Sequence, residues 1–405
     1  MSKNDGMLVS LDIGSSVVRS LVAQIDGDKI TFIGKGEAEN RSGISGGIVV
    51  DLDATTQAIR AAVQEAEQVA NVDVRTVVIG LSNEQLTFIN SQGIVTVRGK
   101  EIVQMDVDRA MEQARNVGVG SDREIIGVEI QEFVVDGQNG IQNPLGMSAK
   151  RLEIKVHIVM ATESVTKNLL RAVNNADLNV DAIVINAIAD SYAILDEDER
   201  KLGVALIDIG HGTTDIMLLT DGSPFYTAVL PIGGEVITRD LGIMFHISPS
   251  EAEEIKVTRG NALVEWVDAN EEVTITVVGS REQKIKKVKE VAEVIQPRME
   301  EILKKIQDKI SEGMQKRGVT SIAVLTGGAS NLRNARELAR EVLQYEQIRI
   351  GHPSVSDDGH GLAEVLKKPE YATAVGIVKY MVHQQKMNKS KKKNWFMKLI
   401  KNFFE

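Results

Sequence analysis

Cysteine is absent from this chain of 405 residues. Without thiols the protein has neither a disulfide framework nor a thiolate metal site, and its six histidines lack the spacing of metal ligands. No apolar run approaches the roughly 18 residues that cross a bilayer, and residues 1–5 do not open a signal peptide. The net charge of −10 argues against nonspecific nucleic-acid binding. We therefore expect a globular cytoplasmic protein with about two to four domains.

Two turns of the same kind stand out in what the sequence does contain. Asp12 opens the first, near the start, and Asp208 opens the second, near the middle; each begins an Asp-Ile-Gly triplet between two apolar runs. A turn rich in Gly, Ser and Thr between two strands points its backbone N–H groups outward and forms an anion cradle. Two such cradles that face each other, each opened by an aspartate, suit a polyphosphate that carries a metal ion.

The surroundings of the two turns repeat as well. An Asp-Gly pair follows at residues 26–27 in the first half and at residues 221–222 in the second, so both halves have the pattern of three strands joined by two turns. Either pattern alone is compatible with ordinary hairpins, but their joint recurrence favours an internal duplication. We expect an α/β fold with two similar domains and a ligand between them.

Periodicity predicts the other elements. In the first half we expect three strands over 7–36, a helix over 53–69, a strand over 76–81 and an inserted α+β subdomain over 83–161. In the second half we expect a helix over 248–259 capped by Ser248 or Ser250, an amphipathic helix pair over 283–310 that Pro297 divides, a last core helix over 370–381 and a polar linker over 384–393.

Gly327 and Gly328 follow a predicted strand, where glycine lets a flat ring pack on the backbone, although a tight strand–helix turn has the same pattern. With this third segment the chain resembles, over nearly its whole length, the superfamily of actin, sugar kinases and heat-shock chaperone ATPases. The segments that carry the resemblance are a phosphate loop at 12–19, a connecting helix at 185–195, a second phosphate loop at 208–215, an adenosine segment at 325–330 and a second connecting helix at 371–380.

This resemblance implies ATP and Mg²⁺ as ligands. Asp12 and Asp208 would hold Mg²⁺ through water, and Arg19 would reach the phosphates. Glu253 and Lys256 would contact the ribose and the adenine, although their spacing is also that of a solvated ion pair. The other cofactor-binding residues that the resemblance implies are Gly14, Ser15, Ser16, Gly210, His211, Gly212, Thr213, Thr214, Gly233, Gly234, Gly327, Gly328 and Ser330.

Two positions depart from the pattern of the superfamily. His211 stands where many relatives have glycine. Asn186 stands where hydrolysing actins use the longer glutamine to position the attacking water, which makes it the candidate catalytic residue of an ATPase that is at most slow. We can identify no catalytic base of the sugar-kinase type.

The C-terminus carries a second informative pattern. Six lysines and no acid lie between residues 389 and 401, and one tryptophan and three phenylalanines crowd into residues 394–405. The spacing predicts an amphipathic helix that lies on an anionic membrane, and the alternative is a terminal helix that docks on the body of the protein. The expected membrane-binding residues are Trp395, Phe396, Lys398, Leu399, Ile400, Lys401, Phe403 and Phe404.

The cleft, the insertion and the tail together resemble the FtsA family, the bacterial actins of cell division. The resemblance implies a peripheral protein on the cytoplasmic face of the inner membrane at the septum. It would form filaments with itself, tether the FtsZ ring and recruit later division proteins through the insertion. Lys284 and Arg298 would meet the C-terminal peptide of FtsZ, with an exposed charged face as the alternative. Two other functions stay open: a small-molecule kinase of the superfamily and a different actin-like scaffold.

The expected domain division follows the same resemblance. The first actin-like domain comprises residues 1–82, 162–202 and 361–383, interrupted by the inserted subdomain at 83–161. The second comprises residues 203–250 and 318–360, with a small subdomain at 251–317. The linker at 384–393 then leads to the membrane-targeting helix at 394–405.

Overall fold

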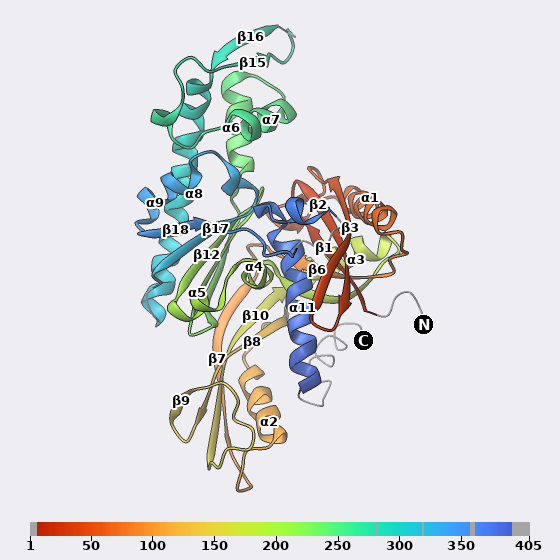
Figure 1. Ribbon diagram of the computed structural model, residues 1–405, viewed down its shortest axis with the longest axis vertical. Coiled ribbons are helices and arrows are strands. Elements are labelled where there is room, and N and C mark those ends of the chain that lie inside the picture. Colours follow the sequence, from red (N-terminus) through yellow and green to blue (C-terminus); the bar gives the residue numbers. More distant parts are fainter. Residues whose placement is uncertain (1–5, 281, 318–319, 357–360, 391–405) are drawn as a thin grey trace.

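The computed structural model describes residues 6–280, 282–317, 320–356 and 361–390. Two five-stranded sheets form its centre, with helices around and between them (Figure 1). The first contains β1 (Met7–Ile13), β2 (Val17–Asp26), β3 (Lys29–Glu39), β6 (Thr76–Leu81) and β11 (Asn179–Ile185). The second contains β12 (Val204–Ile209), β13 (Thr214–Thr220), β14 (Ser223–Leu230), β17 (Ile322–Thr326) and β18 (Gln347–Ile350).

The two sheets have the same topology. Their strand orders are β11-β6-β1-β2-β3 and β18-β17-β12-β13-β14. In each, three antiparallel strands follow one another, and the first of them pairs on its other side with a parallel strand. The internal duplication predicted from the turns is therefore confirmed. One hydrophobic core joins the first sheet to one face of the second, and another covers the other face of the second sheet, as expected for strands that helices cover.

Two helices cross between the sheets. They are α4 (Asn186–Ile194) and α11 (Ala372–Ser390), and α11 runs down the centre of the molecule in Figure 1. Gly376 allows this contact, because a Cβ atom there would lie 2.1 Å from the carbonyl oxygen of Ala189. The other helices of this body are α1 (Leu52–Ala70), α3 (Glu163–Asn175), α5 (Glu197–Leu202), α9 (Ala335–Leu343) and α10 (Ala363–Leu366).

The stretch at 83–161 holds a sheet of its own, seen at the bottom of Figure 1. Its strands are β7 (Thr87–Thr96), β8 (Arg123–Val135), β9 (Gln138–Ile141) and β10 (Arg151–Thr162), in the order β7-β10-β8-β9, and α2 (Gln104–Arg115) packs against it. A separate hydrophobic cluster lies between the helix and the sheet.

At the top of Figure 1 a smaller group of elements extends from the second sheet. It contains α6 (Glu235–Phe245), α7 (Pro249–Arg259), β15 (Glu272–Thr276), β16 (Gln283–Lys287) and α8 (Val288–Arg317). Ser248 caps α7, since its Oγ accepts a hydrogen bond from the backbone N–H of Glu251 at 3.2 Å. The predicted capping of this helix is thus confirmed for Ser248.

The predicted helix pair over 283–310 is wrong in two respects. Residues 283–287 form β16, which pairs with β15, and α8 then runs unbroken through Pro297. A proline inside a helix removes one hydrogen bond to the residue four positions earlier. That residue is Glu293, which is exposed, so water can satisfy its carbonyl group.

The linker predicted over 384–393 also differs from the structure. Helix α11 continues to Ser390, and the polar residues that extend it include no glycine or proline to end a helix. The predicted membrane-targeting helix at 394–405 lies outside the described residues. Among the helices that the structure describes, none is long and apolar enough to cross a bilayer.

Candidate functional site

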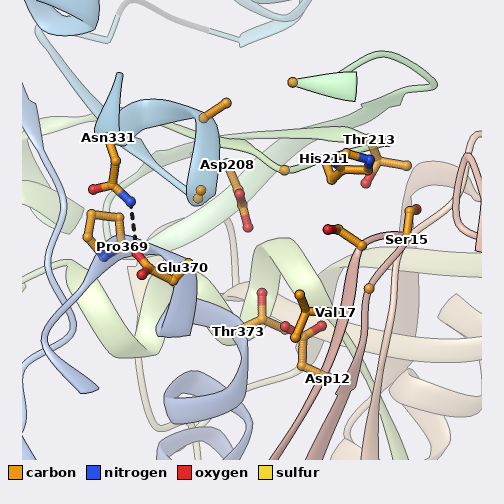
Figure 2. Close-up of a pocket in the computed structure, with 18 of the residues that line it drawn as sticks. Asp12, Ser15, Val17, Asp208, His211, Thr213, Asn331, Pro369, Glu370 and Thr373 are labelled. Atoms are coloured by element: carbon orange, nitrogen blue, oxygen red, sulfur yellow. Dashed lines mark hydrogen bonds between the residues drawn. The ribbon is translucent and has the colours of Figure 1, made fainter. Parts of the chain in front are cut away.

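The two predicted phosphate loops face each other across a cleft. The turn between β1 and β2 closes with a hydrogen bond from Gly14 N–H to Val17 O at 3.2 Å. The turn between β12 and β13 closes in the same way, from Gly210 N–H to Thr213 O at 2.9 Å. Figure 2 shows Ser15 of the first turn opposite His211 and Thr213 of the second. The structure therefore brings together two anion cradles that are far apart in the sequence.

A cavity of about 330 Å³ lies between these turns. Its size is at the lower end of the range for small-molecule sites. The predicted site residues that line it are Asp12, Gly14, Ser15, Ser16, Arg19, Asn186, Asp208, Gly210, His211, Gly212, Thr213, Gly234, Glu253, Lys256, Gly327 and Gly328.

Three residues predicted to bind the nucleotide shape the loops and do not line the cavity. Thr214 donates through Oγ1 to Ile232 O at 2.7 Å, and Ser330 donates through Oγ to Gly327 O at 2.7 Å. Gly233 packs so tightly that a Cβ atom would lie 2.5 Å from the carbonyl oxygen of His211. Both hydroxyl groups are therefore engaged within the protein.

Part of the cavity lining was not predicted from the sequence. Ile237, Val257 and Leu332 add apolar surface, and the segment before α11 adds polar groups. Asp215 and Ala329 lie inside the glycine-rich segments and could have been included from the sequence. The full set of lining residues that were not predicted is Val17, Asp215, Ile237, Val257, Ala329, Asn331, Leu332, Pro369, Glu370 and Thr373.

Asp12 and Asp208, beside the two turns, each contribute a carboxyl group to the cavity wall. Burial raises the pKa of Asp12 to about 6, and the Arg19 guanidinium limits that rise. Burial likewise raises the pKa of Asp208 to about 6. Asp208 Oδ1 is buried and has no hydrogen-bond partner in the described part of the chain. At neutral pH both groups are largely ionised and poorly neutralised, so the site favours a cationic ligand.

Two further aspartates lie behind them. Burial raises the pKa of Asp190 and of Asp215 well above the usual range of a carboxyl group. Ser82 donates through Oγ to both oxygens of Asp215, at 2.7 and 2.8 Å, and Thr373 donates through Oγ1 to Asp190 at 2.8 Å. Asp215 also lines the cavity, whereas Asp190 lies outside its lining.

This donor set fits Mg²⁺ bound through water. Within the described ranges, no three His, Asp or Glu side chains are grouped so as to hold a metal ion directly. Mg²⁺ keeps several waters and often binds through one or two carboxylates and the phosphates of a nucleotide. The unpartnered Oδ1 of Asp208 is an acceptor that such a water would satisfy. When bound, Mg²⁺ would neutralise phosphate charge next to Asp12 and Asp208.

Gly327 forms the wall beside Asp208. Its φ is +82°, and a Cβ atom there would lie 2.0 Å from Asp208 Oδ1 and 2.6 Å from the carbonyl oxygen of Ile209. Only glycine fits this position without moving the acid. Together with Gly328 it leaves bare backbone on this side of the cavity, which suits the face of a planar base.

Glu253 and Lys256, both on α7, point toward the backbone of Gly234. Lys256 Nζ donates to Glu253 Oε2 at 2.7 Å, to Thr238 Oγ1 at 2.9 Å and to Gly234 O at 3.1 Å. Burial opposes the charge of Glu253, but the neighbouring ammonium outweighs it and holds the pKa of Glu253 below its usual range. The spacing that suggested a solvated surface pair is therefore a partly buried pair at the cavity wall.

His211 and Asn186 line the same cavity. Burial, followed by the charge of Lys256, lowers the pKa of His211, so the imidazole is neutral at pH 7. Asn186 is the first residue of α4, and its Oδ1 is buried without a partner among the described residues. A Cβ atom at Gly80 would lie 2.7 Å from that oxygen, which places it against β6.

The cavity is bridged near its edge by one hydrogen bond. Asn331 Nδ2 donates to Glu370 Oε2 at 2.8 Å, drawn as the dashed line in Figure 2. The two residues belong to short 3₁₀ helices, η2 (Gly328–Asn331) and η3 (Pro369–Tyr371). The bond ties the glycine-rich segment to the start of α11.

The two residues predicted to meet a peptide lie away from this cavity. Arg298, on α8, donates through Nε to Asp240 Oδ2 at 2.6 Å and through Nη1 to Glu301. Lys284, on β16, lies 3.6 Å from a carboxylate oxygen of Glu282 and is half exposed. The membrane-binding residues predicted at 394–405 are outside the described ranges.

The fold and the cleft define a class of protein. Residues 205–376 match the family model described as cell division protein FtsA, and residues 83–160 match that of the SHS2 domain inserted in FtsA. Among solved structures, a PilM–PilN type IV pilus biogenesis complex has a TM-score of 0.64 at 18% identity and covers 93% of this chain and 98% of that one. MreB5 of Spiroplasma citri bound to ADP has a TM-score of 0.54 at 12% identity, covering 96% and 99%. The fold is that of the actin-like ATPases.

Curated relatives give the finer assignment. Cell division protein FtsA of Pseudomonas aeruginosa is 35% identical over 381 residues, which cover 94% of this chain and 90% of that protein. The protein of the same name from Escherichia coli K12 is 35% identical over 382 residues, covering 92% and 90%. The chain belongs to the FtsA family of cell division proteins.

Proposed function

We propose that this protein binds ATP and Mg²⁺ in the cleft, polymerises on the cytoplasmic face of the inner membrane and tethers the FtsZ ring at the septum. The observation that carries the proposal is the pair of glycine-rich turns facing each other across one cavity, in a chain of a cell-division family. Two cradles of backbone N–H groups with two aspartates suit a nucleotide polyphosphate and its cation.

The details of the nucleotide site follow from the cavity lining. Backbone N–H groups of the two turns hold the phosphates, and Arg19 adds a positive charge. Glu253 and Lys256 meet the ribose and the adenine, while the backbone at Gly327 and Gly328 packs on the base. Asn186 positions a water for hydrolysis, and we expect slow turnover because its side chain is short.

Membrane attachment rests on residues 394–405. Aromatic and aliphatic residues at helical spacing, with lysines beside them, are typical of helices that lie in a membrane interface. One short helix binds reversibly, but several tails on one filament bind much more strongly through effective concentration. Polymerisation would therefore control attachment, and the inserted subdomain at 83–161 would receive later division proteins.

The test is co-sedimentation with FtsZ and vesicles that contain anionic lipid, in the presence of ATP and Mg²⁺. We expect the intact chain to carry FtsZ into the vesicle pellet. A chain that lacks residues 394–405 should leave the vesicles but keep its affinity for FtsZ in solution. Equal recovery of FtsZ with both chains would contradict the proposed tether.

A further inference from the structure

We propose that Glu37 is a positioning residue, which holds the guanidinium of Arg19 in the orientation that receives the phosphates of the nucleotide. This inference rests on the proposed ATP site and extends it to a residue outside the cavity lining. The evidence is an arrangement of charged groups on one face of the first sheet.

Strand register brings these groups together. Arg19 on β2 is the cross-strand partner of Asp12 on β1 and of Glu37 on β3. Directly paired residues of antiparallel strands point to the same face and lie within side-chain reach of one another. The three residues thus form a row that runs from an aspartate of the cleft to an acid on the edge strand.

The carboxylate of Glu37 is held at both of its oxygens. Oε1 accepts from Arg19 Nε at 2.9 Å, and Oε2 accepts from Lys35 Nζ at 2.8 Å. Lys35 also donates to the hydroxyl of Tyr371 at 3.1 Å, and the guanidinium of Arg19 lies 5.3 Å from the centre of the Tyr371 ring. Side-chain exposure is 18% for Arg19 and 32% for Glu37, so the pair is only partly solvated.

This arrangement constrains Arg19 while leaving its outer nitrogens available. Among the described residues, its side chain donates a hydrogen bond only through Nε, to Glu37. Arg19 lines the cavity, and although burial raises the pKa of Asp12 and of Asp208, the charge of Arg19 limits the rise at both acids. A guanidinium fixed at Nε presents its two Nη groups as a fork that matches phosphate oxygens.

Charge and positioning predict opposite results when Glu37 is removed. Glu37 is an anion near the site of a polyanion, so its charge alone opposes ATP binding. Its hydrogen bonds have the opposite effect, because a preorganised arginine loses less conformational entropy when a phosphate binds. The direction of the change in ATP affinity therefore decides between the two.

The experiment compares Glu37→Ala with Glu39→Ala in the full chain. Glu39 lies two residues further along the same strand and pairs with Arg41 at 3.4 Å in an exposed contact, which makes it a matched control. Affinities for ATP, ADP and AMP are measured by calorimetry with Mg²⁺, and thermal unfolding checks the fold. We expect Glu37→Ala to lose about tenfold in ATP affinity and less than about twofold in AMP affinity.

Two further variants test whether Glu37 acts through Arg19. Glu37→Gln keeps one acceptor for Arg19 and should restore part of the lost affinity. In an Arg19→Ala background, Glu37→Ala should have no further effect on ATP binding, because the group it positions is gone.

Several outcomes would overturn the inference. They are an unchanged or higher affinity for ATP, an equal loss for ATP and AMP, or a full effect of Glu37→Ala without Arg19. Failure of the unaltered chain to bind ATP would instead refute the proposed function, and this inference with it.

Discussion

At the scale of single residues, the site places a carboxylate oxygen that lacks a hydrogen-bond partner among the described residues next to a glycine that no larger residue could replace. Asp208 Oδ1 is buried and has no partner within the described part of the chain, and Gly327 leaves it room that any side chain would fill. A buried carboxylate oxygen without a partner destabilises the empty protein, but it is stabilised when a cation and its waters bind beside it. We therefore expect that Asp208 favours nucleotide binding but lowers the stability of the protein without nucleotide.

Asp208→Ala tests this expectation. The variant should lose ATP binding by at least about a hundredfold, because it removes one of the two ionised acids that face the cation. Its melting temperature without nucleotide should be no lower than that of the parent, since a poorly compensated charge has been removed. Calorimetry and thermal unfolding measure the two effects. Retained ATP affinity would refute the assignment of the site.

The buried carboxyl group of Glu129 predicts that the stability of the protein depends on pH. It lies on β8 and accepts a hydrogen bond from the Tyr380 hydroxyl on α11 at 2.9 Å. Burial raises the pKa of Glu129 from 4.5 to about 7. Between these two values the folded protein holds a proton that the unfolded chain has released. The stability from this group is thus complete below pH 4.5 and is lost as the pH rises to about 7.

Glu129→Gln should remove the loss of stability at high pH, because glutamine does not ionise, and its amide oxygen remains an acceptor for Tyr380. We expect the variant to be more stable than the parent at pH 8 by on the order of 1 kcal/mol, since partial exposure screens the effect, with little difference at pH 4.5. Denaturant unfolding at both pH values measures the difference. The exposed Glu84→Gln is the control, and a gain that is the same at both pH values would contradict this account.

At the scale of elements, the crossing of α4 and α11 holds the two lobes together. Small residues form the contact, since Gly376 packs against the backbone of Ala189. Both helices also reach the cavity, α4 through Asn186 and α11 through Thr373. A shift at the crossing would therefore move groups on the cavity wall.

Gly376→Ala should destabilise the protein by about 3 kcal/mol, because the added Cβ would overlap a backbone carbonyl that cannot rotate away. Thermal or denaturant unfolding measures the change. Gly118→Ala is the matched control, since a Cβ atom there meets nothing within 4 Å. Equal stability of the two variants would mean that the helices can separate without cost.

At the scale of the whole molecule, the inserted subdomain joins both halves. It interrupts the first half of the chain, yet its side chains bond to β14 of the second sheet. Gln131 donates through Nε2 to Pro224 O at 2.7 Å, and His157 Nε2 lies 3.0 Å from Thr227 Oγ1. Burial lowers the pKa of His157 to about 4, so this contact stays neutral at physiological pH. The insertion therefore contacts the second lobe directly, as well as the first lobe from which it extends.

Contacts with a partner protein also concern the whole molecule. Arg298, the residue predicted to meet the FtsZ peptide, already has partners within the chain. Its guanidinium already bonds to Asp240 and Glu301, so the acidic peptide that we propose as its ligand would have to compete with both. Arg298→Gln should weaken capture of the FtsZ C-terminal peptide by about tenfold, whereas Asp240→Asn should strengthen it. Fluorescence anisotropy measures both affinities. Lys304→Gln, which removes an exposed cation of the same helix, should change little. If neither Arg298→Gln nor Asp240→Asn changed the affinity for the peptide, Arg298 would have only a structural role.

Much of this architecture was predictable because its signals are local. The two Asp-Ile-Gly turns, the apolar strands beside them and the repeated Asp-Gly pairs each lie within a short stretch of sequence. Glycine and strand periodicity act through the backbone of their own neighbourhood, so they indicate the duplicated fold and most of the cavity lining at the two turns. The capping of α7 by Ser248 has the same local origin.

Only the tertiary structure decided which distant groups meet. Pro297 lies within one continuous helix, and the residue whose carbonyl group it leaves without an N–H donor, Glu293, is exposed to solvent. The bond between Asn331 and Glu370 and the support of Arg19 by Glu37 join elements that no periodicity connects. The sequence determined the strands, turns and glycines, since these depend on local backbone preferences. The charge balance of the cleft was set by folding, because burial and the approach of remote side chains shift each carboxylate.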